Sequence, residues 1–166
     1  MTGGDASVKW TSETRIAGIQ GDSSEKIQDH LTFLANSWRL NGARVVGLVE
    51  EHTEGLPKAC GGSVLRNLVS GTHHRLYQDL GPYSTACCLD PAGVAESCAA
   101  ILDHISGADL VILSKFGKLE AEGGGLIAAF VCAAEHDKPV LTSVAPPFTK
   151  SYLEFVGPLG AIIPAD

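Results

Sequence analysis

The sequence lacks any apolar run of the roughly 18–20 residues that a membrane span needs. Its first ten residues, MTGGDASVKW, also lack the apolar segment of a signal peptide, and we expect residues 1–13 to form a disordered tail. Basic residues are in deficit: 12 lysines and arginines stand against 19 aspartates and glutamates, a net charge of −7. A chain without a basic excess is not expected to bind nucleic acid non-specifically. The sequence therefore predicts neither a membrane nor a nucleic-acid partner.

Cysteine motifs are also missing. The five cysteines include no C-x-x-C pair, and an odd number of cysteines in a chain without a secretion signal favours free thiols in the reducing cytoplasm. Cys60 and Cys87, together with Cys88, His73 and His74, are candidates for a soft metal site. The alternative is that these thiols lie in the core or in loops. We therefore expect a cytoplasmic protein and assign no metal site.

The sequence does contain a regular alternation of apolar strand and helix patterns. Its 166 residues are enough for one domain with a hydrophobic core. Strands are predicted at 14–20, 43–49, 64–69, 74–80, 110–113, 138–144 and 160–163, and helices after 23, 90, 125 and 150. The strands at 64–69 and 74–80 flank the turn sequence Ser70-Gly71-Thr72 and predict a β-hairpin. This order predicts a single α/β domain over residues 14–166, with three layers, a mainly parallel sheet and an inserted hairpin.

Apolar residues at helical spacing predict the buried faces of two helices. In the first helix they are Ile27, Leu31, Leu34 and Trp38. In the helix after residue 125 they are Leu126, Ile127, Phe130, Val131 and Ala134.

The chain is organised around the segment Asp109–Gly125, DLVILSKFGKLEAEGGG. An apolar strand there runs into a loop with four charges, and in open α/β sheets ligands bind where strands end. Lys115 and Lys118 in this loop suit an anion, either phosphate or a tetrahedral oxyanion. The alternative is that they pair with Glu120 and Glu122 in a solvated loop.

The two glutamates of this loop have two interpretations. Glu120 or Glu122 would serve as a general base or a metal ligand, or each would simply stabilise a helix N-terminus. The following glycines include Gly123 and Gly124, which permit close approach of a ligand or of another backbone segment. The alternative for the glycines is a flexible turn.

Two further segments are candidates for the same site. The turn Gly21, Asp22, Ser23 and Ser24 presents backbone N–H groups at a helix N-terminus, which can bind an anion or can simply cap the helix. Gln78, next to Asp79, is a polar residue near the end of the predicted hairpin, and it either reaches the site or lies in a turn.

Four segments resemble the DUF2478 family of bacterial proteins: FGKLEAEGGG after its apolar strand, NLVSG at 67–71, YQDLG at 77–81 and CCLDP at 87–91. The similarity spans most of residues 16–155. It implies a P-loop NTPase-like fold, distantly similar to THEP1-type nucleoside triphosphatases, and a link to molybdenum or nitrogen-fixation functions. Cys60 and Cys87 match the family, whereas Cys88 stands where the family has arginine.

Both hydrolysis motifs depart from a working P-loop enzyme. The first strand-to-helix turn reads IQGDSSEKI, without G-x-x-x-x-G-K-[ST], and Asp22 places a negative charge where phosphate would lie. THEP1-like proteins resemble D-E-x-G-K-x-E at the position of residues 114–120, where this chain has Ser114 and Lys115 in place of the two carboxylates. We therefore expect the architecture without efficient hydrolysis.

Three functions remain open. The first is a binding protein for a small anionic ligand, either a nucleotide with Mg²⁺ or an oxyanion such as molybdate. The second is a divergent NTPase or phosphotransferase in which Glu120 or Glu122 and Lys118 replace the lost motifs. The third is a scaffold or homo-oligomerising protein, which an exposed apolar patch would favour.

Overall fold

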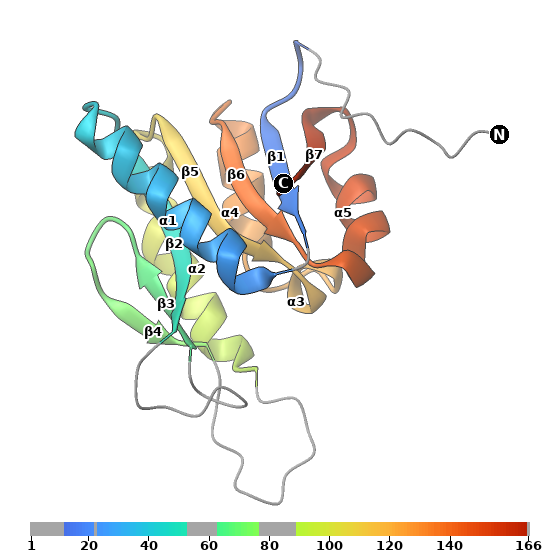
Figure 1. Cartoon of the computed structure of the whole chain (residues 1–166), viewed down its shortest axis with the longest axis horizontal. Helices are drawn as coiled ribbons and strands as arrows, with labels where there is room; N and C mark the ends of the chain where they lie inside the picture. Colours follow the sequence, from blue (N-terminus) through green and yellow to red (C-terminus); the bar gives the residue numbers. More distant parts are fainter. Residues whose placement is uncertain (1–11, 22, 53–62, 77–88, 166) are drawn as a thin grey trace, which may run out of the picture.

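The computed structural model describes residues 12–21, 23–52, 63–76 and 89–165 (Figure 1). Its strands are β1 (Ile16–Gln20), β2 (Val45–His52), β3 (Ser63–Asn67), β4 (His73–Arg75), β5 (Leu110–Phe116), β6 (Val140–Val144) and β7 (Gly160–Pro164). Its helices are α1 (Ser24–Leu40), α2 (Pro91–Ile105), α3 (Lys118–Ala121), α4 (Ile127–Glu135) and α5 (Thr149–Val156), with 3-10 turns at Pro146–Phe148 and Gly157–Leu159.

The strands form one sheet in the order β4-β3-β2-β5-β6-β1-β7. The five strands β2, β5, β6, β1 and β7 pair in parallel, while β3 and β4 extend the sheet as an antiparallel hairpin. This confirms the predicted α/β fold with a mainly parallel sheet and an added hairpin. The second hairpin strand is shorter than predicted, since β4 ends at Arg75 and the predicted residues 77–80 lie outside the described part of the chain.

Helices cover both faces of the sheet, as in P-loop-like three-layer domains (Figure 1). One apolar cluster joins α1, through Leu31 and Ala35, to β2 and β5. A larger cluster on the opposite face joins α2, α4 and α5 to the sheet, with Phe116 of β5 in edge-to-face contact with Phe130 and Tyr152. The connection after β1 therefore crosses one face, and the other parallel connections cross the opposite face.

Local sequence signals explain where the first two long helices begin. Ser23 caps α1, because its hydroxyl accepts a hydrogen bond from Lys26 N at 3.2 Å. Asp90 caps α2 in the same way through Gly93 N, and Pro91 occupies the first helical position of this helix, which was predicted to begin after residue 90. Among the described residues, no helix is long and apolar enough to cross a membrane.

Two strands run further than the sequence predicted. β2 continues through Glu50 to His52, and β5 continues through Ser114 and Lys115 to Phe116. Lys115 is thus a strand residue, and the prediction that it lies in a loop was wrong. The reason is that β5 keeps its parallel partner β6 beyond the apolar run, with Phe116 opposite Val144.

The helix faces were only partly predicted. In α1 the buried residues are Ile27, Gln28, Leu31 and Ala35, whereas Trp38 is 42% exposed. In α4 the buried residues include Phe130, while Val131 is 41% exposed. Apolar spacing missed Gln28 because its side chain is polar, although it is only 4% exposed. Gln28 takes part in the candidate site described below.

Candidate functional site

The carboxyl ends of the parallel strands lie at one edge of the sheet, and neighbouring strands β1 and β6 leave it toward opposite faces. The chain passes from β1 into α1 on one face and from β6 into α5 on the other. Such a switch point is the usual ligand site of an open α/β sheet. Here Gln20, at the end of β1, donates a hydrogen bond to the Thr149 hydroxyl of α5 at 2.7 Å. The two sides of this switch point are therefore bonded to each other.

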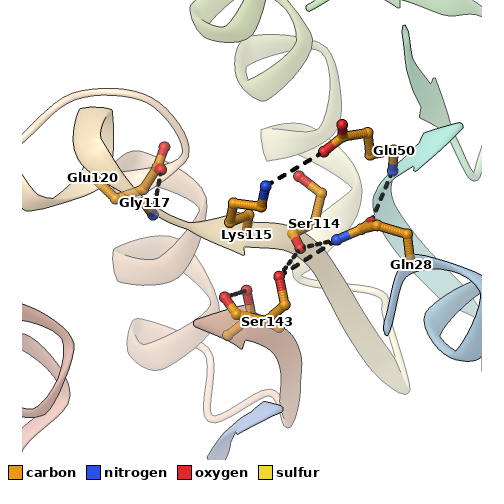
Figure 2. A network of polar contacts seen from close by, with 8 residues as sticks. Gln28, Glu50, Ser114, Lys115, Gly117, Glu120 and Ser143 are labelled. Atoms are coloured by element: carbon orange, nitrogen blue, oxygen red, sulfur yellow. Dashed lines mark hydrogen bonds and ion pairs between the residues drawn. The ribbon is translucent and has the colours of Figure 1, made fainter. Parts of the chain in front are cut away.

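A polar network of largely buried side chains lies beside this switch point (Figure 2). The Gln28 amide donates to the carbonyl oxygen of Ser114 at 2.7 Å and accepts from Glu50 N at 3.0 Å. The Ser143 hydroxyl, at the end of β6, donates to the same Ser114 carbonyl at 2.7 Å. One amide side chain from α1 thus links β2 and β5, and β6 joins them through Ser143.

Lys115 projects from the end of β5 toward β2. Its Nζ lies 3.8 Å from a carboxylate oxygen of Glu50, and the two side chains are 33% and 16% exposed. This distance is that of an ion pair rather than of a hydrogen bond. Lys118 begins α3 three residues later and is exposed. The structure therefore brings both predicted lysines to the same edge, with Lys115 already facing one carboxylate.

Glu120 has a structural role in the loop after β5. It is 8% exposed, its Oε1 accepts from Gly117 N, and its Oε2 accepts from Leu126 N, both at 2.9 Å. Desolvation by burial raises the pKa of Glu120, while the hydrogen bonds from Gly117 and Leu126 lower it by less. Both carboxylate oxygens therefore bond backbone N–H groups, one on each side of α3, and hold this loop together.

The same carboxylate explains why residue 125 is a glycine. Its φ is +58°, and a β-carbon at this position would overlap Oε2 of Glu120. The glycines had suggested a close approach by a ligand or by another backbone segment. At residue 125 the group that approaches closely is the Glu120 side chain of the same chain. Gly123 and Gly124 lie exposed in the turn between α3 and α4, where their N–H groups bond to the carbonyls of Glu120 and Leu119.

A pocket of about 190 Å³ opens beside Lys115. The end of β5 and the start of α3 supply Ser114, Lys115, Gly117 and Lys118 to one side of it. The rest of its wall is largely apolar, with side chains from β3, α2 and α3. Glu50 and Glu120 complete the polar side. Lys115 and Lys118 therefore face the same small cavity.

On the other side of Lys115 lies an open groove between α1 and the end of β2. Its carboxylates are Glu25, Asp29, Glu50 and Glu51, against Lys115 and His52. This groove borders Ser24, the last residue of the predicted phosphate-binding turn. Acidic side chains outnumber cationic ones here, so the groove disfavours a polyphosphate.

Comparison with known proteins identifies the family. The sequence profile described as "Protein of unknown function (DUF2478)" matches residues 16–166. The chain belongs to the DUF2478 family. It is also similar to Molybdenum import ATP-binding protein ModC 2 of Bradyrhizobium diazoefficiens, with 29% identity over 150 residues. That match covers 90% of this chain but 17% of the relative, and no solved structure matches the chain.

The remaining predicted residues of this DUF2478 chain are placed as follows. Gly21 and Ser23 lie at the turn before α1, where Ser23 caps the helix, and Glu122 is exposed at the end of α3. The described residues do not include Asp22, Gln78, Cys60 or Cys87. In the described ranges no three His, Cys, Asp or Glu side chains are grouped so that they could hold a metal ion.

Proposed function

We propose that this DUF2478 domain is a ligand-binding protein that uses a P-loop-like fold to hold a small anionic ligand without efficient hydrolysis. The observation that carries the proposal is the joint placement of Lys115 and Lys118 on one pocket at the carboxyl end of β5. Ligand sites of open α/β sheets lie at this edge, and ammonium groups there attract anions. The similarity to an ATP-binding protein of molybdenum import makes a nucleotide and molybdate the first ligands to test.

The absence of efficient hydrolysis is part of the proposal. Phosphoryl transfer depends on positioned Mg²⁺ and on cradled phosphates. At the end of β5 this chain has Ser114, whose carbonyl is bonded to Gln28 and Ser143, followed by Lys115, which faces Glu50. These groups supply no carboxylate for Mg²⁺ at residues 114 and 115. Glu120, the other candidate for catalysis, has both oxygens bonded to backbone N–H groups.

A thermal-shift screen tests the proposal. Purified protein is heated with ATP, ADP, GTP, GDP, phosphate, sulfate, molybdate or tungstate, each with and without Mg²⁺. A ligand of the native state raises the melting temperature by mass action. The double variant Lys115→Ala with Lys118→Ala is expected to lose the shift while remaining folded. Lys26→Ala with Lys150→Ala, both exposed and outside the pocket, is the matched control.

Two outcomes would contradict the proposal. A shift that survives in the Lys115 and Lys118 double variant would remove these lysines from the site. Turnover of ATP or GTP with Mg²⁺ that is lost in Glu120→Gln would instead favour the divergent NTPase or phosphotransferase.

A second candidate function is association with a protein partner or with a second copy of the chain. Phe33 and Leu40 of α1 are 66% and 88% exposed, and they are seven positions apart, so they lie on one side of the helix two turns apart. The matched relative is about six times as long as the matched region, so in that protein the corresponding segment is one part of a longer polypeptide. Sedimentation of wild type and of Phe33→Ser with Leu40→Ser tests self-association. Equal monomeric mass for both proteins would reject it.

A further inference from the structure

The pocket beside Lys115 has a mainly apolar wall, and this wall restricts its ligand. The wall consists of Leu65, Leu76, Leu89, Val94, Leu119 and Leu126. The polar groups gather on one side, around the segment from Ser114 to Lys118. An apolar cavity with a few convergent polar groups is the usual form of a small-molecule site. A bare oxyanion would leave this apolar wall without a partner.

The size of the pocket limits the apolar part of the ligand. Its volume is about 190 Å³. A leucine-lined cavity of about 150 Å³ holds benzene, whereas drug-sized ligands occupy roughly 300–1,000 Å³. The pocket therefore accommodates one ring or a short branched chain, and it is too small for a complete nucleotide.

The hydrogen-bonding capacity of the polar side favours an anionic head group. In the described part of the chain, no carboxylate lies within 4.0 Å of Lys118 Nζ. Lys115 has three N–H donors, and among the described residues its Nζ pairs only with Glu50, at 3.8 Å. The Glu120 oxygens already accept backbone hydrogen bonds. The unused donors of this wall thus belong to the two ammonium groups, which suit a carboxylate.

We propose that this pocket binds a monoanion with an apolar body no larger than one ring, such as a single-ring aromatic carboxylate or a short branched-chain carboxylate. The carboxylate lies against Lys115 and Lys118, and the body lies against the leucines. This inference rests on the proposed function and names the ligand class of the same site.

The experiment compares four probes on the complete chain by thermal shift and by titration calorimetry. Benzoate and isovalerate combine one charge with an apolar body, benzamide has the same ring without the charge, and phosphate has charge without the body. Benzoate or isovalerate is expected to raise the melting temperature at millimolar concentration, and benzamide and phosphate are expected to give a smaller shift at equal concentration.

Two variants test whether the ligand lies within this pocket. Leu119→Phe, at a partly exposed position on α3, fills the cavity, and Lys118→Gln removes one exposed charge. Each is expected to weaken binding of the carboxylate at least tenfold. Lys150→Gln on α5, which is outside the pocket, is expected to leave it unchanged. If Leu119→Phe does not fold, Lys118→Gln alone still tests the position.

The outcomes separate this inference from the proposed function. Shifts with phosphate, molybdate or ATP but with neither carboxylate would overturn the inference and leave the proposed function in place. Carboxylate binding that survives both Leu119→Phe and Lys118→Gln would also overturn it, because the ligand would then lie elsewhere. No shift with any anion would overturn both.

Discussion

The Glu120 carboxylate occupies the space that a β-carbon on residue 125 would need. Its Oε2 accepts a hydrogen bond from Leu126 N, so the chain after Gly125 is fastened to the same carboxylate that Gly125 makes room for. Oε1 fastens Gly117 on the other side of α3. The glutamate and the last glycine of the segment GKLEAEGGG are therefore explained by how this loop closes. The side chains of Lys115, just before this segment, and Lys118, within it, take no part in these two hydrogen bonds.

Gly125→Ala is expected to be much more destabilising than Gly123→Ala. Both residues have positive φ, which costs an alanine about 1–2 kcal/mol. At residue 125 the added methyl group also overlaps Glu120, and overpacking adds about 1–3 kcal/mol. At residue 123 a β-carbon meets nothing within 4 Å. Urea unfolding of the two variants measures the difference. Equal destabilisation would mean that the carboxylate does not occupy the position described.

Glu120 is expected to make stability depend on pH. Burial raises the pKa of Glu120 in the folded state above its ordinary value of 4.5, so between 4.5 and the raised pKa the native state binds more protons than the unfolded chain. The stability that this proton contributes is complete below 4.5 and is lost as the pH rises through the raised pKa. The free energy of unfolding of wild type minus that of Glu120→Gln should therefore decrease with pH over this window. An increase for Glu120 would show a lowered pKa instead.

Gln28→Met is expected to lower the free energy of unfolding by about 1–3 kcal/mol, the usual cost of leaving a buried polar group unsatisfied. Methionine fills a similar volume but cannot bond Ser114 O or Glu50 N. The Ser114 carbonyl keeps the Ser143 hydroxyl, so Glu50 N is the group left without its partner. His30→Gln, exposed on the same helix, is the control and should stay within about 0.5 kcal/mol. A wild-type urea midpoint for Gln28→Met would show that this network contributes nothing to stability.

Much of the fold could be predicted because its signals are local. The strand at 110–113, the hairpin turn at 70–72 and the helix after residue 90 each follow from neighbouring residues, and the structure confirms them. The extension of β5 to Phe116 could not be predicted in this way, since it depends on the pairing of Phe116 with Val144 of β6, 28 positions later in the chain. A polar residue beyond an apolar run can be assigned to the strand only when its partner strand is known.

The same limit applies to the site. The sequence indicated Lys115, Lys118 and the strand end that brings them together. It did not indicate Gln28 or Glu50, because a glutamine within an amphipathic helix and a glutamate after an apolar strand have no distinctive spacing. Their roles arise from contacts across 22 and 86 positions of the chain, from Gln28 to Glu50 N and to Ser114 O. Gln28 carries a weak signal, since it lies beside the apolar Ile27 on the buried side of α1.

Glu50→Gln is expected to tighten anion binding at the pocket beside Lys115. Glu50 is mostly buried, faces Lys115 at 3.8 Å and lines the same cavity, so its charge opposes an entering anion. Removing this charge retains the backbone bond from Glu50 N to Gln28, so the fold should persist. Benzoate and phosphate affinities, measured by calorimetry, should rise about tenfold for whichever anion binds wild type, which corresponds to about 1.4 kcal/mol. Glu51→Gln is the matched control, because the Glu51 carboxylate pairs with Arg66 and His73 instead. Weaker binding in Glu50→Gln would indicate that Glu50 positions Lys115 for the ligand, and an equal gain in both variants would indicate a general effect of net charge.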